Sequence, residues 1–347
     1  MKNTAVQKKE YAAVDIFKFF CAILVILIHA KPFENIFWID GCIGIVTRFA
    51  VPYFFLSSSY FLFKKLTACQ TFAQKAREYF NYLLRLVRFY AIWFLITNLV
   101  DIAFGATVNS PLWYIKQFVF TTNGSPLWFV SALLWGSLLV FLLSSIFKKY
   151  LVFGFSCVFL VFGYMLSTLL SVTKDWGFIS IINQTITPTI GTQNGFYFAM
   201  PYVALGAIMA TQTIKKEHKK NAILVALFFL LLGVESVVAV MLLDAPFTFL
   251  WISALPMTYF VMRLTLTIEL KPHPNFYYMR KTSTMIYVLH FVVIKVLRKL
   301  FEITPIGAVD GENLILLAAT VGISVGLSLL VVKASKIRGL GFLKFIM

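Results

Sequence analysis

The stretch Ala12–Lys31 reads AAVDIFKFFCAILVILIHAK, and it is long and apolar enough to cross a lipid bilayer as one helix. It nevertheless carries the ionisable residues Asp15, Lys18 and His29. At about 100° per residue, Lys18 and His29 share one helix face with a rise of about 16 Å between them, and Asp15 lies one turn before Lys18 on that face. Because ionisable side chains are costly in hydrocarbon, we expect this face to line a protein interior or a wet cavity.

The composition is that of a membrane protein with several spans. The chain has 347 residues, of which 60% are hydrophobic and only 13% charged, about half the charged fraction usual in a soluble domain. The net charge of +17 does not indicate nucleic-acid binding, because the basic residues lie between apolar runs. The four cysteines show no paired spacing, so we expect neither a disulfide framework nor a metal site.

Apolar runs of about 20 residues, the length needed to cross the bilayer, recur along the chain. They predict an all-α fold, a polytopic membrane bundle of about ten transmembrane helices. We expect residues 1–347 to form a single integral membrane domain with no soluble domain. The expected spans are 12–31, 43–63, 79–102, 126–147, 150–171, 194–213, 221–243, 246–268, 282–301 and 312–333.

The distribution of lysine and arginine predicts the orientation of these spans. Basic residues gather in the loops on the side of the N-terminus and are few in the loops on the other side, which places both termini in the cytoplasm of a cell with the chain in its plasma or inner membrane. The stretch Pro111–Phe120 is expected to form an interfacial helix on the outer side, and Ser171–Asn194 a polar loop lining a mouth. This pattern does not account for Lys295, Arg298 and Lys299, at the outer end of the ninth span.

The three ionisable residues of the first span allow two interpretations each. His29 is either a hydrogen-bonded histidine at the helix end or a general base, for which it needs a polar partner. Asp15 and Lys18 are either an ion pair at the inner interface, with Lys18 snorkelling, or a tunnel-lining lysine held by its aspartate. Lys18 and His29 are too far apart on one helix for direct contact, so any cooperation passes through a substrate or other helices.

Three arginines also lie in or beside predicted spans. Arg85 and Arg88 are three residues apart at the inner end of the third span, so they present one cationic face. A guanidinium pair can grip phosphates, although ordinary positive-inside anchoring explains it as well. Arg48 lies near the outer end of the second span and requires an anionic or oxygen-rich partner, and Pro52 can kink that span beside it.

Three further residues are candidates for a binding cavity. Trp128 begins the fourth span, where an aromatic belt at the membrane interface would also explain it. His290 lies deeper, in the ninth span, with Tyr287 one turn before it on the same face. These two residues form either a satisfied buried pair or a second polar wall of the cavity.

Taken together, these residues resemble the acyltransferase-3 family of integral membrane acyltransferases. Lys18 and His29 match the family's basic residue and histidine separated by ten positions, and Arg85-Leu-Val-Arg88 matches its Arg-x-x-Arg. The likeness covers nearly the whole chain, and the sequence departs from the family at Lys18, usually arginine, and at Ser59, usually glycine. Three phrases also read like the family: RFAVPYFFLSSSYF at 48–61, LWFV at 127–130 and TSTMIYVLH at 282–290.

The resemblance implies transfer of an acyl group, expected to be acetyl, from cytoplasmic acyl-CoA to a hydroxyl of an envelope glycan or another acceptor on the outer side. Arg85 and Arg88 would hold the CoA phosphates, and the pantetheine arm would pass Lys18. His29 would act as general base on the hydroxyl, and Arg48 would stabilise the oxyanion or orient the acceptor. The remaining candidates, Trp128, Tyr287 and His290, would contact substrate.

A transport function is the alternative. The phrase around Arg48 and Pro52 also resembles the membrane part of the serine racemases of vancomycin resistance, which belongs to the same superfamily and has been regarded as an amino-acid uptake module. A carrier for a small polar solute such as serine needs a cavity near the middle of the membrane, but it needs no phosphate site at Arg85. A purely structural membrane partner would explain the spans but not the aligned charges.

Overall fold

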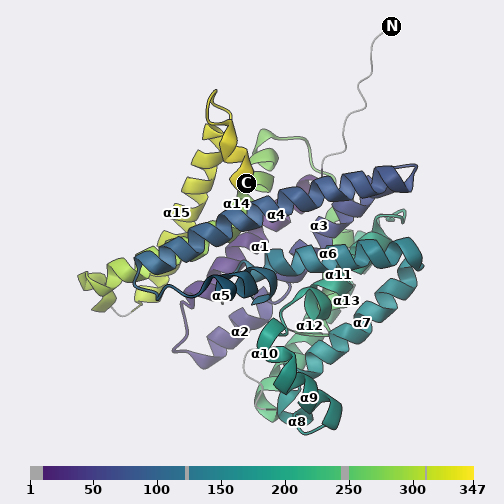
Figure 1. The fold of residues 1–347 in the computed structure, drawn as a ribbon, viewed down its shortest axis with the longest axis horizontal. Coiled ribbons are helices and arrows are strands. Elements are labelled where there is room, and N and C mark those ends of the chain that lie inside the picture. The colour runs from purple at the N-terminus through teal and green to yellow at the C-terminus, as the bar shows by residue number, and fades with distance from the viewer. Residues whose placement is uncertain (1–10, 122–124, 244–249, 309–310) are drawn as a thin grey trace.

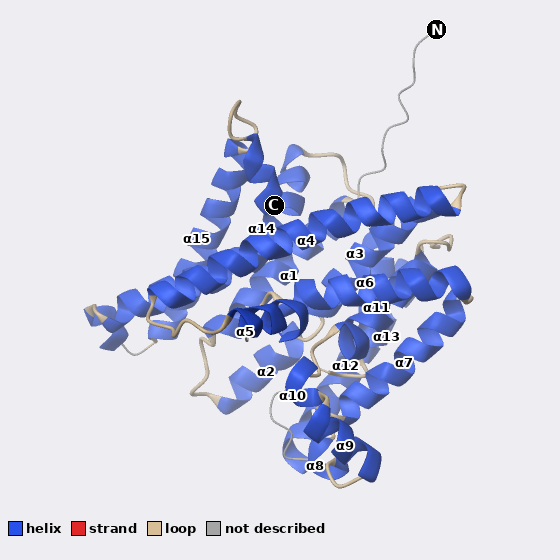
Figure 2. Cartoon of the chain, in the orientation of Figure 1, coloured by secondary structure: helices blue, strands red, loops and turns tan. Residues whose placement is uncertain are grey.

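The computed structural model describes residues 11–121, 125–243, 250–308 and 311–347, and these residues form helices without any strand (Figures 1 and 2). In Figure 1 the long helix α4 crosses the width of the molecule in front of α1 and α14, and α8, α9 and α10 lie together at the lower edge. The main helices are α1 (Ala12–Ala30), α2 (Phe37–Thr47), α3 (Ala50–Thr67), α4 (Phe72–Ala103), α6 (Trp128–Ile146), α7 (Lys149–Met165), α11 (Met200–Met209), α12 (His218–Leu242), α13 (Ala254–Thr267), α14 (Pro274–Glu302) and α15 (Glu312–Ala334). The shorter elements are α5 (Pro111–Lys116), η1 (Gln117–Thr121), α8 (Leu170–Thr173), α9 (Gly177–Thr185), α10 (Thr187–Ile190), η3 (Gly195–Ala199), η4 (Pro305–Ala308) and η5 (Gly341–Ile346).

Each predicted span coincides with helical structure where the structure describes it, and residues 246–249 of the span 246–268 lie outside the described residues. Six of the described helical segments are long and apolar enough to cross a membrane. These six are α1, the α2–α3 segment, α4, α6, α12 and α15. The chain is therefore a multi-pass membrane protein, while the count of ten spans and the orientation stay predictions. The helix expected at Pro111–Phe120 is present as α5 followed by a π-helical turn, η1, and its place at the membrane interface stays a prediction. The expected polar loop at Ser171–Asn194 instead contains the short helices α9 and α10 and part of α8.

The second predicted span, 43–63, lies within one apolar helical segment, Trp38–Thr67, and the break in this segment is of the kind that Pro52 predicts. Helix α2 ends at Thr47, and α3 begins at Ala50 after a turn at Arg48 and Phe49. The cause is Pro52, which has no N–H to bond the carbonyl of Arg48 and whose ring crowds that carbonyl. The break directs the Arg48 side chain away from the continuous helical path and places it where two cavities meet.

The bundle is held by long-range helix pairs, in which α1 packs on α14, α3 on α11, α14 on α15 and α12 on α13. Its core is rich in aromatic side chains, and Tyr53, Phe55 and Tyr202 are fully buried there. The Tyr53 hydroxyl lies 2.8 Å from Oγ1 of Thr265, which ties α3 to α13. These contacts fix α1 and α14 side by side, and most of the candidate residues lie on those two helices.

Helices α3 and α11 approach closely at Gly206. A Cβ atom added at Gly206 would lie 1.8 Å from Oγ of Ser59 and 2.9 Å from the carbonyl oxygen of Leu56. Ser59 stands where the acyltransferase-3 pattern usually has glycine. Its side chain on α3 fits against α11 because Gly206 has no side chain. Small residues that let backbones approach are a general device of membrane helix packing.

We predict that Gly206→Ala lowers the free energy of unfolding by about 1–3 kcal/mol, because the added methyl group overpacks this contact. The measurement is the melting temperature of the detergent-purified protein. Gly233→Ala in α12 is the matched control, since a Cβ there meets nothing within 4 Å. The double variant Ser59→Gly/Gly206→Ala should recover part of the loss, and equal melting temperatures for Gly206→Ala and Gly233→Ala would contradict the prediction.

Two charged residues of the predicted spans, Glu235 and Arg263, have structural partners. The carboxylate of Glu235 accepts hydrogen bonds from the backbone N–H groups of Ile252 and Ser253, at 2.8 and 2.9 Å, just before α13 begins. It therefore satisfies donors at a helix N-terminus, where negative charge is favourable. Arg263 forms an ion pair with Glu217 at 2.8 Å. Both charges stabilise helix ends, so we do not assign them to the site.

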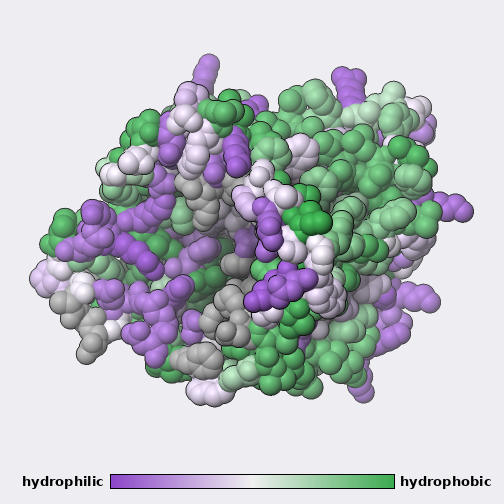
Figure 3. All heavy atoms as spheres, turned by 60° about the horizontal axis from the view of Figure 1, so that its bottom comes forward, coloured by the Kyte–Doolittle hydropathy of each residue, from purple (hydrophilic) through white to green (hydrophobic). Residues whose placement is uncertain are grey.

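The molecular surface separates apolar and hydrophilic regions. In Figure 3 a broad apolar surface occupies the right of the molecule, and hydrophilic residues gather towards the left around a hollow. Exposed apolar side chains follow α7 and α12, including Phe155 and Val158 on the first and Leu230 and Val234 on the second. An apolar surface of this extent is typical of a protein that faces lipid.

Candidate functional site

Lys18 and His29 line two different cavities, which we name the Lys18 cavity and the His29 cavity. The Lys18 cavity has a volume of about 420 Å³ and lies between α1, α3, α4, α6 and α14. Its lining combines apolar and charged side chains: Lys18, Phe54, Ser58, Phe61, Leu62, Lys65, Glu78, Tyr82, Arg85, Leu86, Phe89, Phe129, Val130, Leu133, Thr284, Tyr287 and Met347. Helical spacing puts Lys18 on the cavity face of α1, as the sequence predicts.

The Lys18 cavity has an excess of positive charge. Lys65 and Glu78 form an ion pair and so neutralise each other. Lys18 makes no ion pair with any described residue, and within the same part of the chain Arg85 bonds only the carbonyl of Asn81, at 3.3 Å. The ammonium of Lys18 and the guanidinium of Arg85 are thus left to attract an anionic ligand.

Arg88 differs from Arg85 in its surroundings. Its guanidinium lies 4.1 Å from the ring centre of Phe345 and does not line the Lys18 cavity. Phe345 belongs to η5, which also packs on α4 through a 3.0 Å hydrogen bond from Nε1 of Trp93 to the carbonyl of Ile346. The predicted phosphate-gripping pair is therefore split, with Arg85 in the cavity and Arg88 against an aromatic ring.

Asp15 is buried, and its ion-pair partner lies on α14 and is not Lys18 of its own helix. Its carboxylate lies 3.6 Å from the guanidinium of Arg280 on α14. The structure places Asp15 outside the lining of the Lys18 cavity. Asp15 therefore ties the beginning of α1 to α14, and it affects the cavity by holding α1 in place.

The His29 cavity has a volume of about 500 Å³ and includes residues from α1, α2, α3, α6, α14 and the segment after α10. It brings together His29, Arg48, Trp128 and Tyr287, four of the residues that the sequence singles out. The remaining lining residues are Val25, Ile28, Thr47, Val51, Phe120, Ile190, Gly191, Thr192, Gln193 and Phe198. A histidine, an arginine and several hydroxyl or amide groups thus face one space.

His29 lies in the last turn of α1, which ends at Ala30 and is capped by Lys31 in the left-handed conformation. Its ring centre is 5.2 Å from that of His290 and 6.4 Å from that of Phe291, both on α14. His290 is fully buried, its Nδ1 lies 3.2 Å from the carbonyl oxygen of Ile286, and its Nε2 has no hydrogen-bond partner among the described residues. His290 packs behind His29 and does not line the cavity.

Arg48 occupies the break between α2 and α3. Its guanidinium lies 5.5 Å from the ring centre of Trp251, and the residue lines both the His29 cavity and a smaller apolar cleft beside α12. Thr47 and Gln193 line the same cavity as Arg48, and the Thr47 hydroxyl donates to the carbonyls of Ile43 and Gly44 within α2. Arg48 can therefore direct positive charge towards an anion that forms in the cavity.

Tyr287 lines both cavities and so separates them. Its hydroxyl donates a hydrogen bond of 2.9 Å to the carbonyl of Pro126, and its ring packs against Phe54 and Phe129 at 5.7 and 5.1 Å. Trp128, at the beginning of α6, also lines the His29 cavity and stacks on Phe198 with 5.6 Å between ring centres. The described residues thus form two neighbouring cavities that are separated by aromatic side chains. Helical spacing on α1, by contrast, predicts one continuous path from Lys18 to His29.

Sequence reasoning missed several lining residues. Lys65 and Glu78 lie on either side of the turn between α3 and α4, where they looked like ordinary loop charges. Gln193 and Thr192 belong to the polar stretch expected to line a mouth, and they do line the His29 cavity, but nothing in the sequence singles them out.

Comparison with known proteins places the chain among relatives of known name. The chain is similar to a serine/alanine racemase of Enterococcus gallinarum, with 26% identity over 80% of this chain and 40% of the relative. It is also similar to an amino-acid racemase of Enterococcus faecalis, with 25% identity over 84% of this chain and 42% of the relative. The chain thus spans about two fifths of the length of these relatives, and no solved structure matches it. Residues 11–333 match the acyltransferase-3 family, described as an acyltransferase domain, and the chain therefore belongs to that family.

Proposed function

We propose that the protein is a membrane O-acyltransferase that moves an acyl group, most simply acetyl, from cytoplasmic acyl-CoA to a hydroxyl of an envelope glycan or another acceptor outside the cell. Membership of the acyltransferase family supports the reaction class. The single observation that carries the proposal is Tyr287, which lines a cationic cavity on one side and a histidine-lined cavity on the other. A donor and an acceptor can then enter from opposite sides and meet at that residue.

The Lys18 cavity would hold the donor. CoA carries several phosphates and a long, flexible pantetheine arm, which suits a cavity with two uncompensated cations and an otherwise apolar wall. Arg85 would bind phosphate near the mouth, and Lys18 would lie along the arm. The thioester would then reach the partition formed by Tyr287, Phe54 and Phe129.

The His29 cavity would hold the acceptor. The acceptor oxygen attacks the thioester carbonyl, a C–O bond forms, the C–S bond breaks, and the acyl group leaves CoA as an ester. One ring nitrogen of His29 takes the hydroxyl proton and returns a proton to the departing thiolate, so that CoA leaves as the thiol. Arg48 would stabilise the negative charge that develops on the carbonyl oxygen.

An uptake function for a small polar solute such as serine is the second candidate. Two neighbouring cavities separated by an aromatic partition also suit alternating access. The relatives named as serine/alanine and amino-acid racemases act on amino acids, which makes an amino acid a reasonable cargo. A carrier, however, needs only one of the two cations of the Lys18 cavity for the carboxylate of serine and leaves the other without a role.

The deciding experiment combines binding, turnover and transport. Protein in lipid nanodiscs is titrated with acetyl-CoA, and release of free CoA thiol is followed after addition of envelope glycan fragments. We expect saturable binding and thiol release that depends on the fragments. In parallel, proteoliposomes are tested for uptake of radiolabelled serine in the absence of any acyl donor. Serine uptake together with no acetyl-CoA binding would replace the acyltransferase by the carrier.

A further inference from the structure

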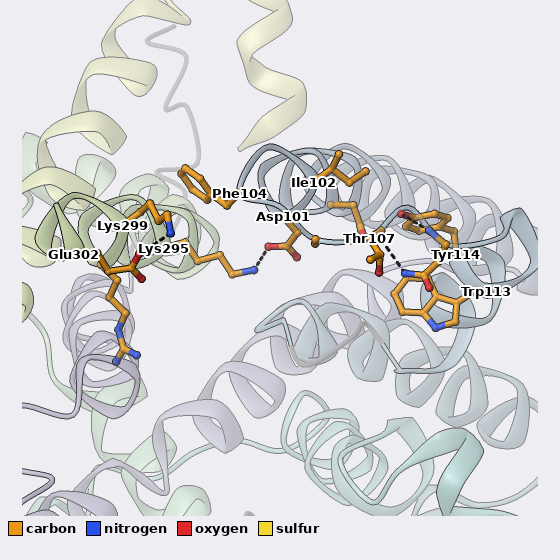
Figure 4. A pocket seen from close by; sticks show the side chains of 13 residues that line it. Asp101, Ile102, Phe104, Thr107, Trp113, Tyr114, Lys295, Lys299 and Glu302 are labelled. Atoms are coloured by element: carbon orange, nitrogen blue, oxygen red, sulfur yellow. Dashed lines mark hydrogen bonds and ion pairs between the residues drawn. The ribbon is translucent and has the colours of Figure 1, made fainter.

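A third cavity accounts for the charges at the end of α14 that the sequence left unexplained. This cavity, the Asp101 cleft, has a volume of about 380 Å³ and lies between the last turns of α4 and α14 and the segment leading into α5 (Figure 4). Charged residues line one end and the middle, while Trp113 and Tyr114 line the other end. It opens on the side of the bundle where α1 ends, which is the predicted outer side.

The charges of the Asp101 cleft do not cancel. Lys295 pairs with Asp101 across the gap between α14 and α4, and Lys299 pairs with Glu302 at 2.5 Å on α14 itself. Arg298 is exposed and forms no ion pair with any residue in the described part of the chain. One guanidinium, a group suited to bidentate binding of carboxylates, therefore remains for a ligand.

The rest of the cleft offers aromatic and amide groups. The rings of Trp113 and Tyr114 stand edge to face, with centres 5.0 Å apart, and both residues are half-buried. Asn98 uses its amide nitrogen to bond the carbonyl of Phe94 at 2.8 Å, which leaves its side-chain oxygen as an acceptor. Aromatic faces beside fixed amides and ion-paired carboxylates suit a ring that has apolar C–H faces and several hydroxyl groups.

The cleft is adjacent to the proposed reaction centre. The ammonium of Lys295 lies 4.2 Å from the ring centre of Phe291, and the ring centre of His29 lies 6.4 Å from the same ring centre. One aromatic side chain therefore separates a wall of the Asp101 cleft from the proposed general base.

We propose that the Asp101 cleft is the docking site of the acyl acceptor and that it selects an acidic sugar. This inference rests on the proposed acyltransferase function for the identity of the ligand as acceptor. One ring of the glycan lies against Trp113, its hydroxyl groups bond Asn98 and the carboxylates, and the carboxylate of the acidic sugar next to it binds Arg298.

Binding is measured without an acyl donor, so the result does not depend on catalysis. Protein in phosphatidylcholine nanodiscs is titrated calorimetrically with cellobiouronic acid and with cellobiose, which differ only in the carboxylate. We expect the acid to bind about tenfold more tightly. Arg298→Gln should bring the two affinities together, whereas Trp113→Ala should weaken both. Lys174→Gln, an exposed outer-side charge away from the described cavities, is the matched control and should change neither.

Two results would overturn the proposal. One is equal binding of both disaccharides, or a preference for the acid that persists in Arg298→Gln. The other is loss of sugar binding when the nanodiscs contain the anionic lipid phosphatidylglycerol, which would assign the cleft to lipid headgroups. Acetyl-CoA binding is measured on the same preparations, so failure of the acceptor site is distinguished from failure of the acyltransferase function.

Discussion

Replacing His29 with alanine is expected to lower the rate of acyl transfer about 10²- to 10⁴-fold, the usual contribution of a general base. His29 lines the His29 cavity, and Arg48 lines the same cavity. Without the imidazole, the acceptor hydroxyl must lose its proton to water. The measurement is the rate of CoA thiol release from acetyl-CoA with envelope glycan fragments present.

A general base and a structural residue give different results in this experiment. His29 lies away from the Lys18 cavity, so His29→Ala should leave the dissociation constant of acetyl-CoA unchanged while turnover is lost. The matched control is His218→Ala, which removes an exposed histidine at the beginning of α12. If His29→Ala turns over at the rate of His218→Ala, His29 is not the base, and the cavity must activate the hydroxyl in another way.

The parts of the site that follow from local geometry could be predicted from the sequence. The positions of Lys18 and His29 on one face of α1 depend only on helical periodicity, and both side chains do line cavities. The break beside Pro52 likewise depends on chemistry within one turn. What periodicity could not provide is that Tyr287, from a helix some 260 residues later, separates the two side chains. Partitions of this kind are set by tertiary packing.

Ion-pair partners were the least predictable part, because they come from distant helices. Asp15 looked like the natural partner of Lys18, three residues away, but its carboxylate pairs with Arg280. Lys295 had no assignable role in the sequence, since its partner Asp101 lies 194 residues earlier on α4. In both cases the sequence identified an unusual charge correctly, and only the packing of α14 against α1 and α4 supplied the second group.

The same contrast between local pattern and packing leads to the second prediction, which concerns Arg85 and Arg88. Spacing alone makes them equivalent, yet Arg85 lines the Lys18 cavity while Arg88 lies over Phe345. We expect Arg85→Gln to raise the dissociation constant of acetyl-CoA about 10- to 100-fold, because a charge-assisted hydrogen bond to phosphate is worth about 1.5–3 kcal/mol. Calorimetric titration of the nanodisc protein measures it.

Arg88→Gln is the matched control, and its effect should be several-fold smaller, because its guanidinium already has an aromatic partner outside the cavity. The same change, from a guanidinium to a shorter neutral amide, is made in both variants, so a difference between them reflects where the lost charge lay. Repeating the titration with dephospho-CoA, which lacks the 3′-phosphate, shows which phosphate Arg85 binds. If Arg85 binds the 3′-phosphate, Arg85→Gln should weaken the binding of dephospho-CoA less than that of acetyl-CoA. Equal losses for Arg85→Gln and Arg88→Gln would mean that η5 moves away from α4 when the donor enters, whereas no loss for either would remove the donor from the Lys18 cavity and favour the carrier.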